Sequence, residues 1–273
     1  MKGPLWILSS ALIWLVFLDV ALGEEPKRIE DNSFLVEEAY NQERGVVQHI
    51  QTLQYMKDHT LSYAFTQEWP LGGKTHQFSY TIPTQRVKEP ETRTGLGDAA
   101  VAYRYQWIDQ DQLAVAPRLS LIFPNGNYKK GLGTDALGLQ ANLPLSLIFS
   151  ERWVTHWNAG TTWTPNARES GGARGDTLGF GFAASLIYQP LPNINLMLET
   201  KWDSLESVIS DEEKDRQESF FVSPGIRFAK DYPSGLQVVP GIAFPIGVGP
   251  SRDDYGVLVY ISLEHPFTFL LFH

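Results

Sequence analysis

Residues 152–163 read RWVTHWNAGTTW, and the order of residue types in this stretch decides the fold class. Every second residue from Trp153 to Trp163 forms one set, which includes three tryptophans; the set between them is mostly small or polar. Alternation with a period of two predicts a β-strand. Ten residues of a strand tilted by about 40° span roughly 25 Å, the height of the lipid-facing band of a membrane barrel. The stretch therefore predicts a membrane-spanning strand with aromatic residues near both edges of the bilayer.

The same alternation recurs along nearly the whole chain from Gly45 onward. Including a weaker run at 47–55, it predicts about 12 strands of roughly 10–14 residues, close to the length that a tilted membrane strand needs. The connections predicted to be short turns are 149–152, 189–193 and 230–235. Those predicted to be longer polar loops are 124–134, 165–177 and 203–218. Short turns at one end and long loops at the other are typical of an up-and-down outer-membrane barrel.

A soluble barrel also alternates, so the second face of each strand discriminates between the two classes. One strand carries Gly179, Gly181, Ala183 and Ser185 on that face, where a water-facing strand would carry charged residues. Small uncharged side chains suit an enclosed lumen. The predicted fold is therefore all-β: a closed, transmembrane, up-and-down antiparallel β-barrel of about 12 strands, with a short N-terminal helical or irregular segment.

The N-terminal region divides into two parts. Residues 1–23 combine Lys2, an apolar run at 5–20 and small residues at its end, the pattern of a cleaved secretory signal peptide. The alternative is an uncleaved anchor, but Asp19 within the run and the polar sequence after it favour cleavage. Residues 24–44 then form an N-terminal periplasmic segment, and residues 45–273 the outer-membrane barrel.

The segment 32–45, NSFLVEEAYNQERG, is the one stretch with helical character. Asn32 or Ser33 could cap a helix, with Glu37 and Glu38 in or near its first turn. Docked on the barrel, the segment would be either a plug at the periplasmic mouth or a plain tether, and the sequence leaves both interpretations open.

Composition restricts the classes of partner. The chain has no cysteine, which excludes a disulfide scaffold, and its net charge of −9 gives no reason to expect nucleic acid. The expected partners are outer-membrane lipids, an unidentified small-molecule solute and, during biogenesis, the barrel-assembly machinery.

Outer-membrane strands commonly finish on an aromatic residue, and either Phe267 or Phe272 could be the residue that ends the last strand. No ligand spacing for a metal appears, so neither a metal nor a cofactor is predicted.

Polar residues of the inward parity are the candidates for lining the lumen. They are Glu68, Asp98, Arg104, Arg118, Gln140, Asn142, His156, Asn158, Glu199, Lys201, Arg227 and Glu264. Their four acids and four bases do not make a ring of one sign, as an ion-selective pore would use. Ion pairs that brace the lumen are favoured over eyelet charges that orient a solute, because opposite charges in a confined interior tend to pair.

His156 is the one candidate for chemistry. Some outer-membrane lipid hydrolases use a barrel histidine with a nearby serine, but residue 158 is asparagine, and His156 has the inward parity. A base without an adjacent nucleophile has nothing to activate, so no catalytic residue is predicted. The outward parity supplies candidate membrane-interface aromatics instead: Trp69, Trp107, Trp153, Trp163, Tyr188 and Trp202.

Residues 117–146 and 151–167, with upstream pieces at 31–43, 65–70 and 95–106, resemble the outer-membrane proteins grouped as the "putative meta-pathway phenol-degradation" family, often called simply "transporter". The resemblance covers most of the predicted mature chain. It implies an outer-membrane barrel that passes small molecules, with aromatic or apolar ones favoured. It carries no functional residues over to this sequence.

The sequence thus favours a non-enzymatic, porin-like channel or transporter in the outer membrane of a Gram-negative bacterium. A barrel of about 12 strands falls between the filled eight-stranded barrels and the water-filled ones of 16 or more. Two alternatives stay open: a structural barrel with a closed, ion-pair-braced lumen, and an outer-membrane lipid hydrolase.

Overall fold

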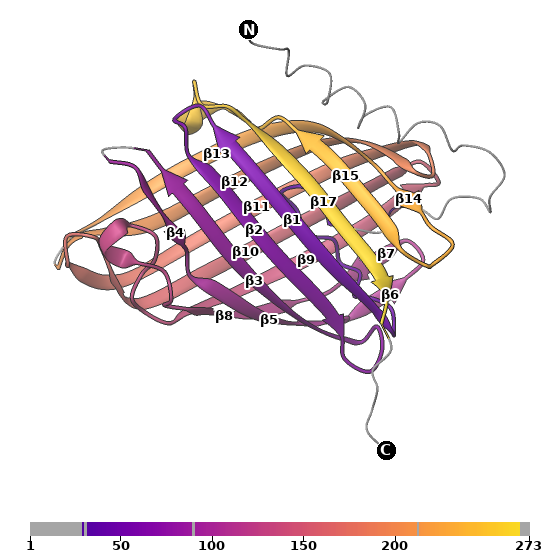
Figure 1. Ribbon diagram of the computed structural model, residues 1–273, viewed down its shortest axis with the longest axis horizontal. Coiled ribbons are helices and arrows are strands. Elements are labelled where there is room, and N and C mark those ends of the chain that lie inside the picture. The colour runs from indigo at the N-terminus through magenta and orange to yellow at the C-terminus, as the bar shows by residue number, and fades with distance from the viewer. Residues whose placement is uncertain (1–28, 30–31, 89–90, 212, 268–273) are drawn as a thin grey trace, which may run out of the picture.

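The chain folds into one closed antiparallel β-sheet (Figure 1). The computed structural model describes residues 29, 32–88, 91–211 and 213–267, so the predicted signal peptide and Phe272 lie outside the described residues. The strands are β1 (Val46–Met56), β2 (Leu61–Pro70), β3 (His76–Val87), β4 (Arg93–Leu96), β5 (Ala99–Tyr105), β6 (Ile108–Gln110), β7 (Leu113–Val115), β8 (Arg118–Phe123), β9 (Gly138–Ser150), β10 (Trp153–Arg168), β11 (Arg174–Leu191), β12 (Ile194–Ser210), β13 (Glu213–Phe228), β14 (Lys230–Asp231), β15 (Gln237–Ala243), β16 (Ile246–Gly247) and β17 (Gly256–Pro266). Two 3-10 turns, η1 (Tyr128–Lys130) and η2 (Gly249–Ser251), lie in connections.

These segments occupy twelve positions around the barrel, because β4–β5–β6, β7–β8, β13–β14 and β15–β16 are each one interrupted strand. Pro117 and Pro245 fall at two of the interruptions, where a residue without an N–H cannot donate to the ladder. The barrel closes where β1 pairs with β17, from Val46↔Pro266 to Met56↔Gly256. The twelve-stranded fold class is therefore confirmed. Within the described ranges, no helix has the length and apolarity needed to cross a bilayer.

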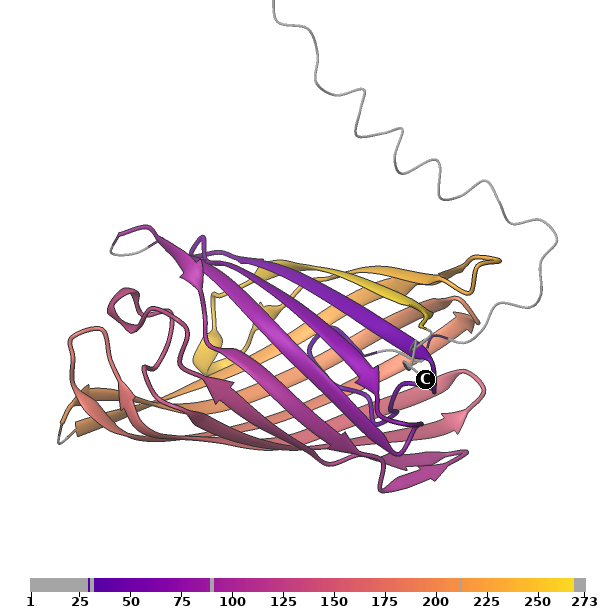
Figure 2. The same cartoon turned by 60° about the horizontal axis from the view of Figure 1, so that its bottom comes forward.

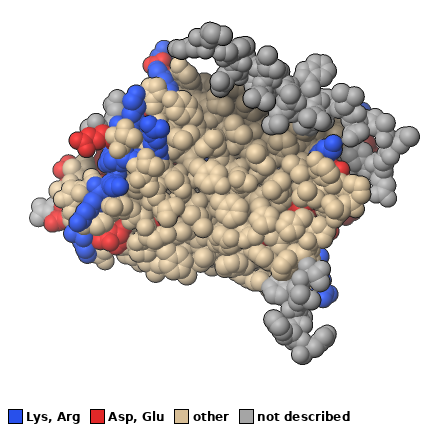
Figure 3. All heavy atoms as spheres, viewed as in Figure 1, with Lys and Arg blue, Asp and Glu red and all other residues tan. Residues whose placement is uncertain are grey.

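The two ends of the barrel differ. The terminal end holds Val46 and Pro266 together with short turns such as 151–152 and 192–193. The distal end holds the long connection 124–137. Figure 3 shows the Lys, Arg, Asp and Glu side chains of one face gathered at the two ends, with a broad middle band of other residues.

The outer surface of that middle band is apolar. Trp153, Trp157 and Trp163 are each about two-fifths exposed, at 41%, 40% and 43%. Leu139 and Leu186 are exposed on the same surface. A closed barrel satisfies every backbone group of its strands internally, so an exposed apolar exterior suits a lipid bilayer.

Two predicted long loops are wrong, because most of their residues are strand. β10 runs to Arg168 and β11 begins at Arg174, so only 169–173 remains of the loop predicted at 165–177. Likewise β12 and β13 leave only 211–212 of the predicted 203–218. The four strands β10–β13 have 16–18 residues, longer than predicted, and their hairpins extend at the distal end (Figure 2).

Cross-strand ion pairs stabilise this extension beyond the apolar band. Glu206 on β12 lies 3.2 Å from Lys214 Nζ and 2.8 Å from an Arg216 nitrogen on β13. The backbone N–H of Leu178 donates to the same carboxylate and, with the two cations, holds the pKa of Glu206 below its usual value. Opposite charges on facing strand residues favour pairing, so a polar sequence here continues the sheet.

Residues 32–44 run inside the barrel and contain no helix, so the helical character predicted for this stretch is wrong. Several side chains of the segment are buried, among them Phe34 at 6% exposure and Ala39 at 0%. Its backbone amides donate to wall side chains instead of to carbonyls four residues earlier. Those wall contacts replace the intrahelical bonds.

Candidate functional site: the occupied lumen

The central feature of the lumen is an extended stretch of chain, residues 32–42, which we call the lumen segment. Five of its backbone amides donate to side chains of the barrel wall. The pairs are Leu35 N to Glu199 Oε1 (3.2 Å), Glu37 N to Asn158 Oδ1 (2.8 Å), Ala39 N to Ser146 Oγ (2.8 Å), Asn41 N to Gln106 Oε1 (2.9 Å) and Gln42 N to Gln77 Oε1 (2.7 Å). The acceptors come from β12, β10, β9, the β5–β6 junction and β3, so the segment crosses the lumen from wall to wall.

The spacing of these donors explains the conformation. Four of the five are alternate residues, which in an extended chain point to one side. Glu37 is held most like a strand, because Asn158 Nδ2 also donates to the Glu37 carbonyl at 2.8 Å. An amide side chain on β10 thus makes both bonds that a neighbouring strand would make.

Phe34 anchors the start of the segment in a niche formed by two glycines. A Cβ atom on Gly225 would lie 2.5 Å from Phe34 Cε2, and one on Gly241 would lie 2.5 Å from Cε1. The ring therefore fits only because β13 and β15 carry no side chain at these positions. Tyr260 of β17 packs edge-on against it, with ring centroids 5.6 Å apart.

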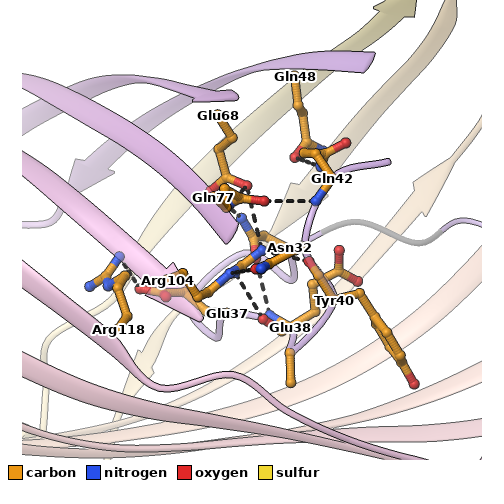
Figure 4. Close-up of polar contacts among 12 residues, drawn as sticks. Asn32, Glu37, Glu38, Tyr40, Gln42, Gln48, Glu68, Gln77, Arg104 and Arg118 are labelled. Carbon is orange, nitrogen blue, oxygen red and sulfur yellow. Dashed lines mark hydrogen bonds and ion pairs between the residues drawn. The ribbon is translucent and has the colours of Figure 1, made fainter. Parts of the chain in front are cut away.

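Arg104 binds the other part of the lumen segment (Figure 4). Its guanidinium donates to Asn41 Oδ1 at 2.7 Å, to the Glu38 carbonyl at 3.1 Å and to the Tyr40 carbonyl at 2.5 Å. Glu68 lies 3.8 Å away and is buried with it. A buried cation is tolerated when its donors and charge are matched, and here the segment provides three of the acceptors.

Buried side chains of β11, β12 and β13 bind the start of the segment. Arg227 on β13 donates to the Asn32 carbonyl at 2.5 Å. Glu199 accepts from Leu35, and the Ser33 hydroxyl lies 3.3 Å from that of Ser185 on β11. Arg227 and Glu199 are 1% and 0% exposed. Both predicted lumen charges therefore contact the segment and not an open channel.

The distal side of the segment faces a cavity of about 220 Å³. Arg118 lies there, 2.7 Å from Glu37 Oε1 and 2.7 Å from Gln140 Oε1. Lys201 pairs with Asp203 at 3.3 Å. The cavity is also lined by Asn142, Asn158 and the glycines Gly160, Gly179 and Gly181.

Asp98 and Glu264, also predicted to line the lumen, lie elsewhere along it. Asp98 accepts from Gly126 N, Thr134 N and Thr134 Oγ1, each at 2.8–2.9 Å. It thereby fixes the long distal connection. Glu264 of β17 lies opposite Gln48 of β1 on one side and opposite Gln237 of β15 on the other. It is close to the terminal end of the barrel.

The terminal side of the segment faces a cavity of about 350 Å³. Its lining includes Glu38, Tyr40, Lys74, His156 and Gln189. Because Glu37 lines the distal cavity and Glu38 this one, the two cavities lie on opposite sides of the segment.

His156 has a nucleophile beside it, which the sequence analysis missed. Ser146 Oγ, on the neighbouring strand β9, lies 2.7 Å from His156 Nδ1. The premise that no nucleophile is adjacent is therefore wrong. The pair is nonetheless buried, at 0% and 3% exposure, and the Ser146 hydroxyl already accepts from Ala39 N.

The sequence predicts no contact between the N-terminal segment and four wall side chains that hold it in place. These are Gln77, Gln106, Ser146 and Ser185. Gln77, Ser146 and Ser185 have the inward parity of their strands, which was the available signal. Their partners are 35–152 residues away in sequence, so only the fold could reveal the pairing.

The predicted interface aromatics lie on the outer wall. Trp69 packs edge-on against Phe267, with ring centroids 4.8 Å apart, and Trp153 stands 4.8 Å from Tyr188. Trp107 is 66% exposed and Trp163 43%. Trp202 faces Phe182 and Phe220 in the middle of β12. Their assignment to the two interfaces stays a prediction.

Fold and lumen together define a class: a twelve-stranded barrel with an apolar exterior, built like outer-membrane barrels and filled by its own N-terminal segment. The chain belongs to the family described as "Putative MetA-pathway of phenol degradation", whose model matches residues 40–246. The resemblance found in the sequence is thus confirmed. No curated protein matches the chain in sequence.

Solved structures that share the fold include an outer-membrane channel and a porin. An outer-membrane channel from Pseudomonas putida F1 is 13% identical, covers 84% of this chain and 98% of its own, and superposes with a TM-score of 0.62. The NanC porin is 11% identical, covers 81% of this chain and 100% of its own, and gives a TM-score of 0.53. At such identities the likeness establishes the barrel fold.

Proposed function

We propose that this protein is a non-enzymatic outer-membrane channel for passive passage of small molecules, closed at rest by its lumen segment. Its lipid-facing band would lie among outer-membrane lipids, and its insertion would need the barrel-assembly machinery. The likeness in fold to an outer-membrane channel and a porin supports this reading. With that placement, the terminal end faces the periplasm.

The observation that carries the proposal is the way the segment is held. Five of its backbone amides donate to side chains of the barrel wall, and not to the backbone carbonyls of a neighbouring strand. Each such bond contributes about 0.5–1.5 kcal/mol net, and water can replace every partner. A segment held by exchangeable polar contacts, with cavities of about 220 and 350 Å³ on either side, suits a closure that can be reversed.

Two observations bear on the class of solute: the side chains that line the cavities and the description of the family. The two cavities are lined by both polar and apolar side chains, for example Arg118 and Leu35 in the distal one and Lys74 and Ile187 in the other. The family description points to phenol degradation. Together they favour small, weakly polar or aromatic molecules.

Deleting residues 24–44 should convert a nearly silent barrel into a conducting one. The expected result in planar bilayers is discrete conductance steps for the deletion variant, larger than any from the full mature chain, because both cavities would then be continuous. The control is deletion of 24–28 alone, which keeps the lumen segment. Heat-shifted gel mobility would verify that all three proteins are folded.

A deletion variant that stays as silent as the full chain would contradict the proposal. The wall side chains alone would then close the lumen, and the structural-barrel alternative would hold.

Ser146 and His156 keep the hydrolase alternative open to test. Because the pair is buried under Ala39, we expect no phospholipid hydrolysis. Activity in the wild type that Ser146→Ala abolishes would overturn this expectation.

A further inference from the structure

A row of polar side chains crosses the outer wall near the terminal end. Tyr80 Oη donates to Gln67 Oε1 at 2.5 Å, and Gln67 Nε2 lies 3.1 Å from His49 Nδ1. His49 Nε2 then lies 3.0 Å from His265 Nε2. The four residues come from β3, β2, β1 and β17, which are adjacent in Figure 1. His49 shares the outward parity of Leu53, which is exposed on this face. Polar residues on a lipid-facing wall are costly, so they point to a function.

The hydrogen bonds assign the protons on the two imidazoles. His265 Nδ1 lies 2.9 Å from the Pro266 carbonyl, so it carries a proton and leaves a lone pair on Nε2. His49 Nε2 therefore donates to His265 Nε2, and His49 Nδ1 accepts from Gln67. The two Nε2 atoms share a single proton between the first and last strands of the barrel.

We propose that His49 and His265 form a binding site for a divalent transition-metal ion of the Zn²⁺, Ni²⁺ or Cu²⁺ type. Imidazole nitrogen is a preferred ligand of these ions. Nitrogen ligands at 2.0–2.1 Å from a tetrahedral ion stand about 3.3 Å apart, a few tenths of an ångström more than the present separation. The ring planes differ by 17° and the centroids lie 5.1 Å apart, so the two imidazoles meet almost end to end through their Nε2 atoms. Each ring would turn by about 35° to point its Nε2 lone pair at a shared tetrahedral ion.

The row of side chains can deliver the required tautomer. To bind the ion, His49 moves its proton from Nε2 to Nδ1, with no net gain or loss of protons. Gln67 then turns its amide to accept from Nδ1 and to donate to Tyr80, whose hydroxyl can accept as well as donate. His265 needs no change, because its Nδ1–H already donates to a carbonyl, as in many metal-bound histidines.

Water would complete the coordination, because in the described ranges no group of three or more His, Cys, Asp or Glu side chains could hold a metal. The ion would join β1 to β17 across the seam at which the barrel closes. Binding to the folded state alone would add stability to that closure.

Isothermal titration of ZnCl₂ into the folded, tag-free mature barrel in detergent tests the proposal. The comparison uses wild type, His49→Gln, His265→Gln and His76→Gln. His76 is the matched control: it lies on the same outer face and bonds to Tyr103 Oη at 2.6 Å. We expect one equivalent bound by wild type and by His76→Gln. Each of the other two variants should bind at least about tenfold more weakly, since even outer-shell changes cost metal sites 10–100-fold.

Gel mobility would confirm that every variant is folded. Undetectable binding to wild type would overturn the site. So would equal binding in all four proteins, or weakening by only one of the two histidine substitutions, because either shows that the imidazoles do not act as a pair.

Discussion

Replacing Arg104 with Met should release the lumen segment while leaving the barrel folded. Arg104 donates to Asn41 Oδ1 and to the carbonyls of Glu38 and Tyr40, and it stands 3.8 Å from the buried Glu68. Removing one member of a buried, hydrogen-bonded charged pair costs about 3–5 kcal/mol. Most of that cost falls on the docked state, because water can satisfy the same groups once the segment leaves. The ratio of docked to undocked segment should therefore fall by about two to four orders of magnitude.

Hydrogen exchange measured by mass spectrometry on the peptide covering 32–42 reads this change directly. The amides of Ala39 and Asn41 should lose protection, while those of the barrel strands keep theirs. Arg86→Met is the control, since Arg86 is an exposed arginine on the neighbouring strand β3. Unchanged protection of the segment in Arg104→Met would show that this arginine does not hold it.

Phe34→Ala should open the lumen to ions. The ring fills the niche made by Gly225 and Gly241 and packs against Tyr260, so its removal leaves an apolar cavity that no neighbour can fill. Phe→Ala changes at buried sites cost about 3–5 kcal/mol. In planar bilayers we expect the open state to be favoured by about two to four orders of magnitude relative to wild type.

Leu35→Ala is the matched control for that variant. Leu35 is the next residue, is only half-buried and keeps its backbone bond to Glu199. If Leu35→Ala opened the barrel as often as Phe34→Ala, the glycine niche would have no special part in docking.

The barrel itself could be predicted because its signal is local. The alternation in 152–163 needs only neighbouring residues, and the structure places Trp153 and Trp163 on the outer face. The limits of β10–β13 could not be predicted in the same way. Their distal ends are charged, and the pairing of Glu206 with Lys214 and Arg216 can be recognised only once the register of β12 with β13 is known.

The lumen segment shows the opposite case, in which a local signal was misleading. Residues such as Glu37 and Glu38 after Asn32 favour a helix start. The bonds that decide the conformation come from Glu199, which is 164 residues away from Leu35, and from Asn158, which is 121 away from Glu37. Tertiary contacts of that range outweigh helix propensity. The Ser146–His156 contact is a different case, because the two residues are 10 apart and face each other in the β9–β10 hairpin, so it depends on the register of that one hairpin.

A reversible covalent lock tests the central claim, that the lumen segment closes the channel. The chain has no cysteine, and the Ser33 and Ser185 hydroxyls lie 3.3 Å apart, so Ser33→Cys with Ser185→Cys can form a disulfide without competitors. Phe34→Ala would be combined with this pair to provide an open barrel. We predict conductance in reductant, its loss on oxidation and its return on re-reduction, with no redox response in either single-cysteine variant. Conductance that persists with the disulfide formed would contradict the account.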